Sequence, residues 1–185
     1  MEARELEQRH EAGERDFAGV VIEKQFLGLL KVDLSGADLS GANLAGADLA
    51  TTDLRRANLA GVNLEGANLE ASILDEADLR SCRFWKARLA GANLRGATLR
   101  NTSFLEADLE KADLSGTNLS RTSLAYAALV GADLRQTIIY ATDLAARHGS
   151  CVNPSHANLR GAKVDPDFPV ELAAVRPDGT ETGLR

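Results

Sequence analysis

The sequence predicts an all-β solenoid, a rod in which the chain winds as a four-sided coil. The first observation is a large apolar residue every five residues from Leu34 to Leu144, which is Leu in 20 of the 23 units spanning residues 32–146. The second is that the residue two positions earlier is always small or β-branched. The third is that Asp or Asn directly precedes the large residue in 15 units. The remaining three central residues are Phe84, Phe104 and Ile139.

A period of five matches neither regular secondary structure, because one face of a strand repeats every two residues and a helix repeats about every 3.6. The large and small residues of a unit lie two apart, so they share one side of a short extended segment. A corner follows, where Gly occupies positions 36, 41, 46, 61, 66, 91, 96, 116 and 131. Four corners close a coil of about 20 residues, and coils stack at roughly 4.8 Å. We expect Leu on Leu inside and ladders of Asp and Asn outside. A helical bundle is disfavoured, because Gly recurs too often and the period of the Leu residues is not helical.

The composition fits a core of Ala, Leu and Val, since 44% of residues are hydrophobic but only 4% are aromatic. The net charge of −6 argues against a general nucleic-acid binder. No apolar stretch has the length of a membrane span. The charged opening MEARELEQRHEAGER is unlike a signal peptide, and two cysteines suggest no disulfide framework. We therefore expect a cytoplasmic protein.

Several segments resemble the pentapeptide-repeat family, whose motif is A(D/N)LXX. They include ADLSGANLAGADL and ANLEGANLEASILDEADL, and the opening LEQRHEAGERDFAG is similar to the lead-in of many bacterial members. The resemblance implies a right-handed quadrilateral β-helix. Some members of the family are DNA mimics that bind DNA gyrase and protect it from inhibitors, and others are regulators in filamentous cyanobacteria. No catalytic member sets a pattern that could be transferred to this chain.

The five-residue phase extends beyond the main run. Three earlier units have large residues at Phe17, Ile22 and Leu27, and the step of seven from Leu27 to Leu34 predicts an insertion of two residues. Towards the C-terminus the phase returns at Leu159 and Val164. The intervening residues 147–156 lack the repeat, so we expect an irregular coil side or a protruding loop.

The two ends are predicted to be short helices that cover the open coils, because an open solenoid end exposes core and unpaired edges. Residues 2–12 are a charged helix stopped by Gly13. Asp167 begins a second helix whose apolar stripe includes Leu172 and Val175. The expected organisation is an N-terminal capping helix at 1–14, a β-helix at 15–164 with its irregular segment at 147–156, and a C-terminal cap and loose tail at 165–185.

One corner of the predicted rod carries apolar residues that face outward. Trp85, Leu105 and Ala125 occupy the same position in successive coils, with Tyr126 next to them. An exposed patch of this kind is typical of a contact surface for a partner protein or a second copy of the chain. The alternatives are chance exposure and cover by a terminal segment. Inside the same wall, Phe84 and Phe104 should stack directly.

A second wall carries alternating charges, which we interpret as a solvated ion-pair ladder rather than a site. Its members are Arg55, Asp75 and Arg95, one per coil, with Arg56 and Glu76 beside them.

The sequence predicts no catalytic, cofactor or metal site. His148, Cys151 and His156 could ligate zinc in principle, but their spacing matches no metal motif and a fourth ligand is missing. Cys82 occupies an inward small position and should be an inert packing residue. A filled narrow rod also leaves no cleft for a substrate, so we do not expect an enzyme.

Charge decides between the two leading functions. A rod of this length needs about 16 net negative charges to match duplex DNA. The repeat run holds 15 Asp or Glu against 11 Lys or Arg, which leaves a net charge of only −4. The sequence therefore favours a non-enzymatic scaffold that binds a protein partner, unidentified or a second copy, through one face of the rod. Protection of DNA gyrase by DNA mimicry is the alternative.

Overall fold

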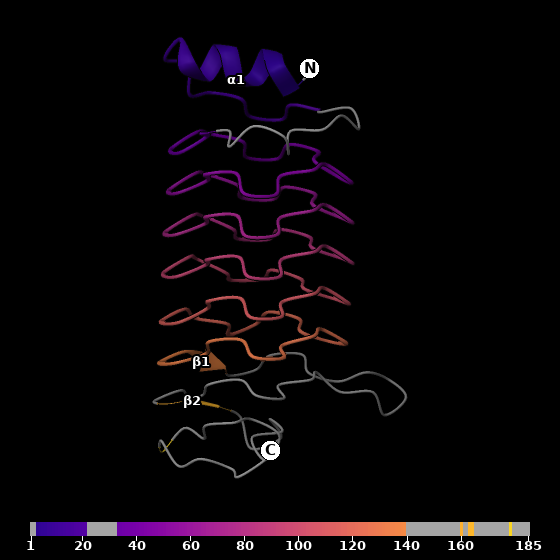
Figure 1. Ribbon diagram of the computed structural model, residues 1–185, viewed down its shortest axis with the longest axis vertical. Coiled ribbons are helices and arrows are strands. Elements are labelled where there is room, and N and C mark those ends of the chain that lie inside the picture. Colours follow the sequence, from indigo (N-terminus) through magenta and orange to yellow (C-terminus); the bar gives the residue numbers. More distant parts are fainter. Residues whose placement is uncertain (1–2, 22–32, 140–159, 161–162, 165–177, 179–185) are drawn as a thin grey trace.

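The computed structural model describes residues 3–21, 33–139, 160, 163–164 and 178. Figure 1 shows a stack of coils with helix α1 (Ala3–Glu11) across its N-terminal end. Strands β1 (Ile138–Ile139) and β2 (Lys163–Val164) pair in parallel at the other end. Within the described part of the chain, no helix is long and apolar enough to cross a membrane.

The coils stack with a regular repeat of four units. Parallel bridges join each unit to the fourth unit after it, from the pair Asp33 and Asp53 to the pair Asn118 and Ile138. The Leu34 N–H, for example, donates to the Asp53 carbonyl at 2.8 Å. Four five-residue units thus make one coil, and the predicted four-sided β-solenoid is confirmed.

Each corner is a β-turn with a left-handed third residue. The Ala37 N–H donates to the Leu34 carbonyl at 3.1 Å, and Gly36 has a φ of 67°. This is the pattern of a type II turn, which favours glycine at that position. Other residues adopt the same conformation elsewhere, such as Lys111 at 57°. The stack of coils therefore imposes the left-handed conformation at each corner, and glycine adopts that conformation without the steric strain that other residues incur.

The core is filled by the two inward residues of each unit. The central residues from Leu34 to Ile139 are at most 1% exposed, and Ala92 is fully buried. Phe84 and Phe104 stack with ring centroids 4.9 Å apart and planes 12° apart, as predicted. Leucines of successive coils thus form one continuous apolar column.

Cys82 is one of the inward small residues, as expected. Its thiol is buried and donates to the Leu59 carbonyl at 2.9 Å. Burial raises the pKa of this thiol to about 12. The raised pKa keeps the thiol protonated at neutral pH, whereas the thiolate is the nucleophilic form. Cys82 is therefore a packing residue.

The Asp or Asn before each central residue has two roles. Asp33 accepts the Ser35 N–H at 2.8 Å, which closes an Asx-turn at the corner. Asn58 also donates from its side-chain amide to Asp38 of the preceding coil at 3.0 Å. The ladder was predicted from the sequence, whereas the Asx-turn was not.

The sequence spacing of the paired residues changes at both ends of the regular stack. Asp16 pairs with Asp38 rather than with Gly36, where the regular spacing would place its partner, and this agrees with the predicted two-residue insertion. Ile139 pairs with Val164, so the five-residue phase is kept. These partners are 25 residues apart instead of 20, so five more residues separate them than in the regular stack. The expected loop at 147–156 lies outside the described residues.

Helix α1 lies within the predicted 2–12 segment. Gly13 follows it with a φ of 96°, and the Gly13 N–H donates to the His10 carbonyl at 2.9 Å. Leu6 is fully buried in the same apolar cluster as the coil leucines, and His10 Nε2 lies 3.3 Å from the Ser35 carbonyl. The expected C-terminal helix, which begins at Asp167, falls outside the described residues.

Candidate functional site

The candidate contact surface is one corner of the rod, which we call the aromatic corner. Three successive coils build it. The Lys86 N–H donates to the Leu105 carbonyl at 3.1 Å, and the Glu106 N–H donates to the Ala125 carbonyl at 2.9 Å. The residues predicted for this corner are therefore brought together, and they are Trp85, Leu105, Ala125 and Tyr126.

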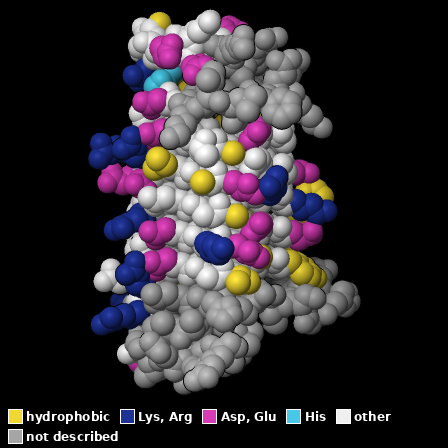
Figure 2. All heavy atoms as spheres, in the orientation of Figure 1, with side chains coloured by type: hydrophobic (Ala, Val, Ile, Leu, Met, Phe, Trp, Pro, Cys, Tyr) yellow, Lys and Arg dark blue, Asp and Glu magenta, His cyan; other side chains and the backbone are white. Residues whose placement is uncertain are grey.

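Two aromatic side chains of this corner are exposed to solvent. Trp85 is 38% exposed and Tyr126 is 42% exposed. Val21, near the N-terminal end, is the other exposed large hydrophobic residue in the described part of the chain. Figure 2 shows hydrophobic side chains at the right-hand edge of the rod, interleaved with charged ones. The aromatic corner thus differs from the polar surface around it.

Exposure was expected for Trp85, Leu105 and Tyr126, and Leu105 is less exposed than expected. Leu105 is half-buried, because the coils that carry Trp85 and Ala125 flank it on both sides. Ala125 is only 4% exposed, since it has one methyl group beyond a hydrogen-bonded backbone. The accessible surface consists of the two aromatic rings with part of Leu105 between them.

Trp85 is held in place by two charged neighbours that sequence reasoning missed. Its indole N–H donates to Glu106 Oε1 at 3.3 Å, and Lys86 Nζ lies 4.6 Å from the ring centroid. Lys86 Nζ and Glu106 Oε2 are 3.6 Å apart. The available signal was their spacing, since opposite charges four units apart stack on one corner. This arrangement orders the indole before any partner arrives.

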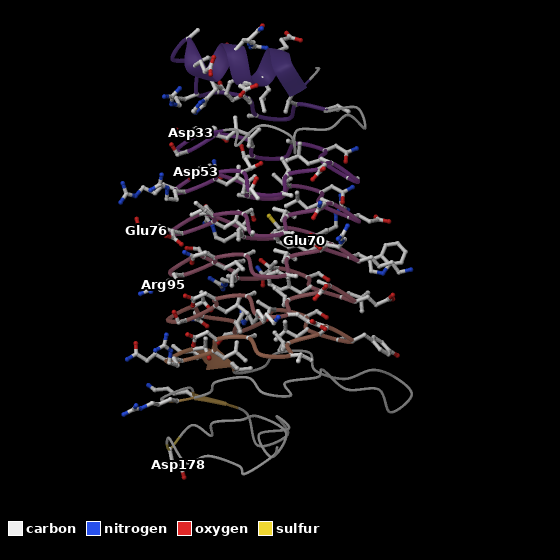
Figure 3. The ribbon with its side chains drawn as sticks, in the orientation of Figure 1. Asp33, Asp53, Glu70, Glu76, Arg95 and Asp178 are labelled. Atoms are coloured by element: carbon white, nitrogen blue, oxygen red, sulfur yellow. The ribbon has the colours of Figure 1, made fainter. Side chains whose placement is uncertain are left out.

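The charged wall is a ladder only in part. Arg56 pairs with Glu76 of the next coil at 2.9 Å, as predicted. Arg55 instead pairs with Asp53 of its own unit rather than with Asp75. Figure 3 shows Asp53 and Glu76 along the same edge of the rod.

Asp75 is the unusual residue of this wall. Its Oδ1 atom is buried and has no hydrogen-bond partner within the described structure. Burial raises the pKa of this carboxyl, and the charges of Arg95 and Arg55 oppose that effect. We assign it no catalytic role, because its acidic neighbour Glu76 is paired with Arg56 and the charge of Asp75 itself is balanced by Arg95 and Arg55.

The described residues contain no cluster of His, Cys, Asp and Glu that could hold a metal ion. The three residues considered for zinc, His148, Cys151 and His156, lie outside the described part of the chain.

A four-sided β-helix with a filled core and an exposed aromatic corner defines a solenoid built from five-residue units. The model of pentapeptide repeats matches residues 33–70, 72–104 and 102–139 in eight copies. These segments make up more than half of the sequence, so the chain belongs to the pentapeptide-repeat family. The fold is a right-handed β-helix solenoid. Proteins of this family are generally structural or interaction modules rather than enzymes.

Several solved structures are similar to this chain. HetL, a pentapeptide-repeat protein involved in heterocyst differentiation regulation in the cyanobacterium Nostoc sp. strain PCC 7120, is 25% identical with a TM-score of 0.54, over 98% of this chain and 99% of HetL. The pentapeptide-repeat protein alr5209, also from Nostoc, is 37% identical with a TM-score of 0.29, over 57% of this chain and 77% of alr5209. QnrB1, a plasmid-mediated fluoroquinolone resistance protein, is 21% identical with a TM-score of 0.42, over 86% of this chain and 84% of QnrB1. The comparison with curated protein sequences found no match.

Proposed function

We propose that this protein is a non-enzymatic scaffold that binds a partner protein through the aromatic corner. The observation that carries this proposal is the exposure of Trp85 and Tyr126 together on one corner of a polar rod. Tryptophan and tyrosine are enriched among the few residues that carry most of the binding energy of protein interfaces. The likeness to HetL, which is involved in regulation, supports a regulatory rather than a metabolic partner.

The rigidity of the site supports the same function. Glu106 and Lys86 fix the Trp85 indole, and the corner backbone is hydrogen-bonded to both neighbouring coils. An ordered side chain loses little conformational freedom on association, so more of its contact energy appears as affinity.

The expected organisation of the chain belongs to this proposal. In it, residues 1–14 cap the first coil and residues 15–164 form the β-helix that presents the aromatic corner. Residues 165–185 form the C-terminal cap and tail. The buried Leu6 of α1 supports the role of the first segment, because it closes the apolar column at its N-terminal end.

The test compares Trp85→Ala with Arg95→Ala, a residue on another corner. Capture from the native host measures binding of a partner protein, and sedimentation of the purified protein measures self-association. We expect Trp85→Ala to weaken binding by about 2 kcal/mol, roughly thirtyfold, and to leave the melting temperature nearly unchanged. Arg95→Ala should bind as the natural protein does. Equal binding by both variants would exclude the aromatic corner as the contact.

A gyrase supercoiling assay addresses the alternative function. Our proposal expects neither inhibition of supercoiling nor protection from gyrase inhibitors at micromolar protein. Either effect would favour the DNA-mimic function over the scaffold.

A further inference from the structure

The charges of this acidic protein are separated along the rod. Residues 33–78 hold nine Asp or Glu and two Arg. Residues 79–105, more than a full coil, hold no acidic residue and six basic ones. Residues 106–113 hold four acidic residues and one Lys, and residues 114–132 then hold Arg121 and no acidic residue. Positive charge is therefore concentrated in residues 79–105, on a chain whose net charge is −6.

A trough lies on one face of the middle coils. Its floor contains Thr98 and Asn118, which pair across successive coils. Arg100 and Arg121 line one rim, at the corner that follows the floor residues along the chain. The opposite rim carries Gly96 and Gly116, and an added Cβ would meet no atom within 4 Å at Gly116 but would lie 3.7 Å from Glu76 Cγ at Gly96. The trough is therefore open beside Gly116, bordered by the Glu76 side chain beside Gly96, and basic on the other side.

Several hydrogen-bond donors of the trough have no acceptor in the described part of the chain. Arg80, one coil earlier, forms a hydrogen-bonded ion pair with Asp78. The side chains of Arg100 and Arg121 have no ion-pair or hydrogen-bond partner in the described structure. The Asn118 Oδ1 accepts the Ser120 N–H at 2.9 Å, but its amide N–H groups find no acceptor among the described residues. Such a site matches a ligand that supplies oxygen acceptors and negative charge.

We propose that this trough binds a short carboxylate-rich segment of a partner protein. The guanidinium groups of Arg100 and Arg121 would each receive a carboxylate in their planar fork, and the Asn118 amide would donate to the segment lying along the floor. The rim and the aromatic corner are on different corners of the rod. The trough is therefore a second surface, independent of the function proposed above.

The charges around the trough favour an acidic peptide over a nucleic acid. A duplex extends its phosphates along the whole rod, and on this face it would meet the acidic coils that include Asp38 and Asp78. The unpaired arginines occupy only two successive coils, about 5 Å apart. This spacing suits a few neighbouring carboxylates, whereas a longer polyanion would be repelled at one end.

The test measures binding of a fluorescently labelled peptide rich in Asp and Glu to the full chain at low salt. The variant Arg100→Gln with Arg121→Gln removes both forks. The control Arg55→Gln with Arg56→Gln changes the net charge equally, but at residues that already have partners. The variant Trp85→Ala tests whether the peptide binds at the aromatic corner instead of the trough.

We expect the Kd for the peptide to rise at least about tenfold in the trough variant and to stay within about twofold in the control and in Trp85→Ala. Binding should weaken at physiological salt, where the Debye length is about 8 Å. Three results would overturn the proposal: no measurable peptide binding at low salt, equal losses in the trough and control variants, or tighter binding of a duplex DNA oligonucleotide than of the peptide.

Discussion

At the scale of single residues, each unit allows little volume inside the coil and much freedom outside it. Ala92 is fully buried, whereas Asn93 points outward and accepts the Arg95 N–H through Oδ1 at 3.1 Å. We expect Ala92→Leu to destabilise the protein by about 1–3 kcal/mol, because the added methylenes have no room. Asn93→Asp should be mild, since a carboxylate accepts the same hydrogen bond. Thermal unfolding measures both, and equal shifts would contradict the inward and outward assignment.

The corner residues give a second prediction. Gly91 has a φ of 67° and Lys111, at the same corner of the next coil, has a φ of 57°. A Cβ at Gly91 would meet no atom within 4 Å, so only the backbone conformation opposes a side chain there. We expect Gly91→Ala to cost about 1 kcal/mol. Lys111→Gly, the matched control, should cost less than half as much in chemical denaturation. A larger loss in the control would show that packing, rather than φ, governs the corners.

Asp75 gives a prediction that depends on pH. Because burial raises the pKa of its carboxyl, the folded protein binds this proton more tightly than the unfolded chain. The ionised carboxylate therefore destabilises the fold at neutral pH. The cost declines as the pH falls through the folded pKa and vanishes below the unfolded pKa of about 3.9.

We expect Asp75→Asn to raise the Tm at neutral pH, with a gain that shrinks towards pH 4 and below. Asp38→Asn is the control. The backbone N–H and hydroxyl of Ser40, followed by the Asn58 amide, lower the pKa of the Asp38 carboxyl, so this variant should not gain stability at neutral pH. A gain for Asp75→Asn that is independent of pH would contradict the desolvation of the carboxylate.

Among structural elements, the coils were predictable from the sequence because their signal is strictly periodic. A large apolar residue recurs every five residues, with a small residue two positions before it. This pattern fits a unit that consists of one short extended side and one corner. The two-residue insertion before Leu34 was visible for the same reason. The irregular stretch expected at 147–156 lies between Ile139 and Val164, but the five additional residues there were not predicted, because an insertion of one whole unit leaves the five-residue phase unchanged.

Helix α1 contacts the rod through its buried residues Leu6 and His10, and this leads to a prediction about the end of the rod. Leu6 is buried against the coil core, whereas Gln8 on the same helix is exposed. We expect Leu6→Asp to detach the helix, expose the first coil and promote association, because unpaired strand edges template pairing. Gln8→Asp should stay monomeric. Sedimentation velocity distinguishes them, and a monomeric, equally stable Leu6→Asp variant would show that α1 does not cap the coil.

For the molecule as a whole, the sequence located the aromatic corner but not its exposed surface. The stacking of every fourth unit placed Trp85 and Tyr126 together. The burial of Ala125 and Leu105 depends on contacts with the flanking coils, which the repeat does not encode. The interaction of Trp85 with Lys86 and Glu106 likewise requires side-chain conformations. Register is thus a property of the sequence, whereas exposure is a property of the packed rod.

The rod combines two surfaces that differ in chemistry. The aromatic corner offers apolar contact, and the trough beside Arg100 and Arg121 offers charge. The hydrogen-bonded coils hold both in fixed positions, since each coil is bonded to its neighbours on both sides. A partner that carries an apolar contact and an acidic segment could use both surfaces if it extends from one corner of the rod to the next.

The most direct test of the aromatic corner uses the single tryptophan of the chain, Trp85. Fluorotryptophan incorporation gives one fluorine resonance that reports on this residue alone, whatever tryptophans the partner contains. On addition of a partner purified by capture, we predict that the resonance shifts or broadens and that its solvent isotope shift decreases, because the indole becomes buried. A complex that forms while the resonance and its solvent isotope shift stay unchanged would contradict the claim that the aromatic corner binds the partner.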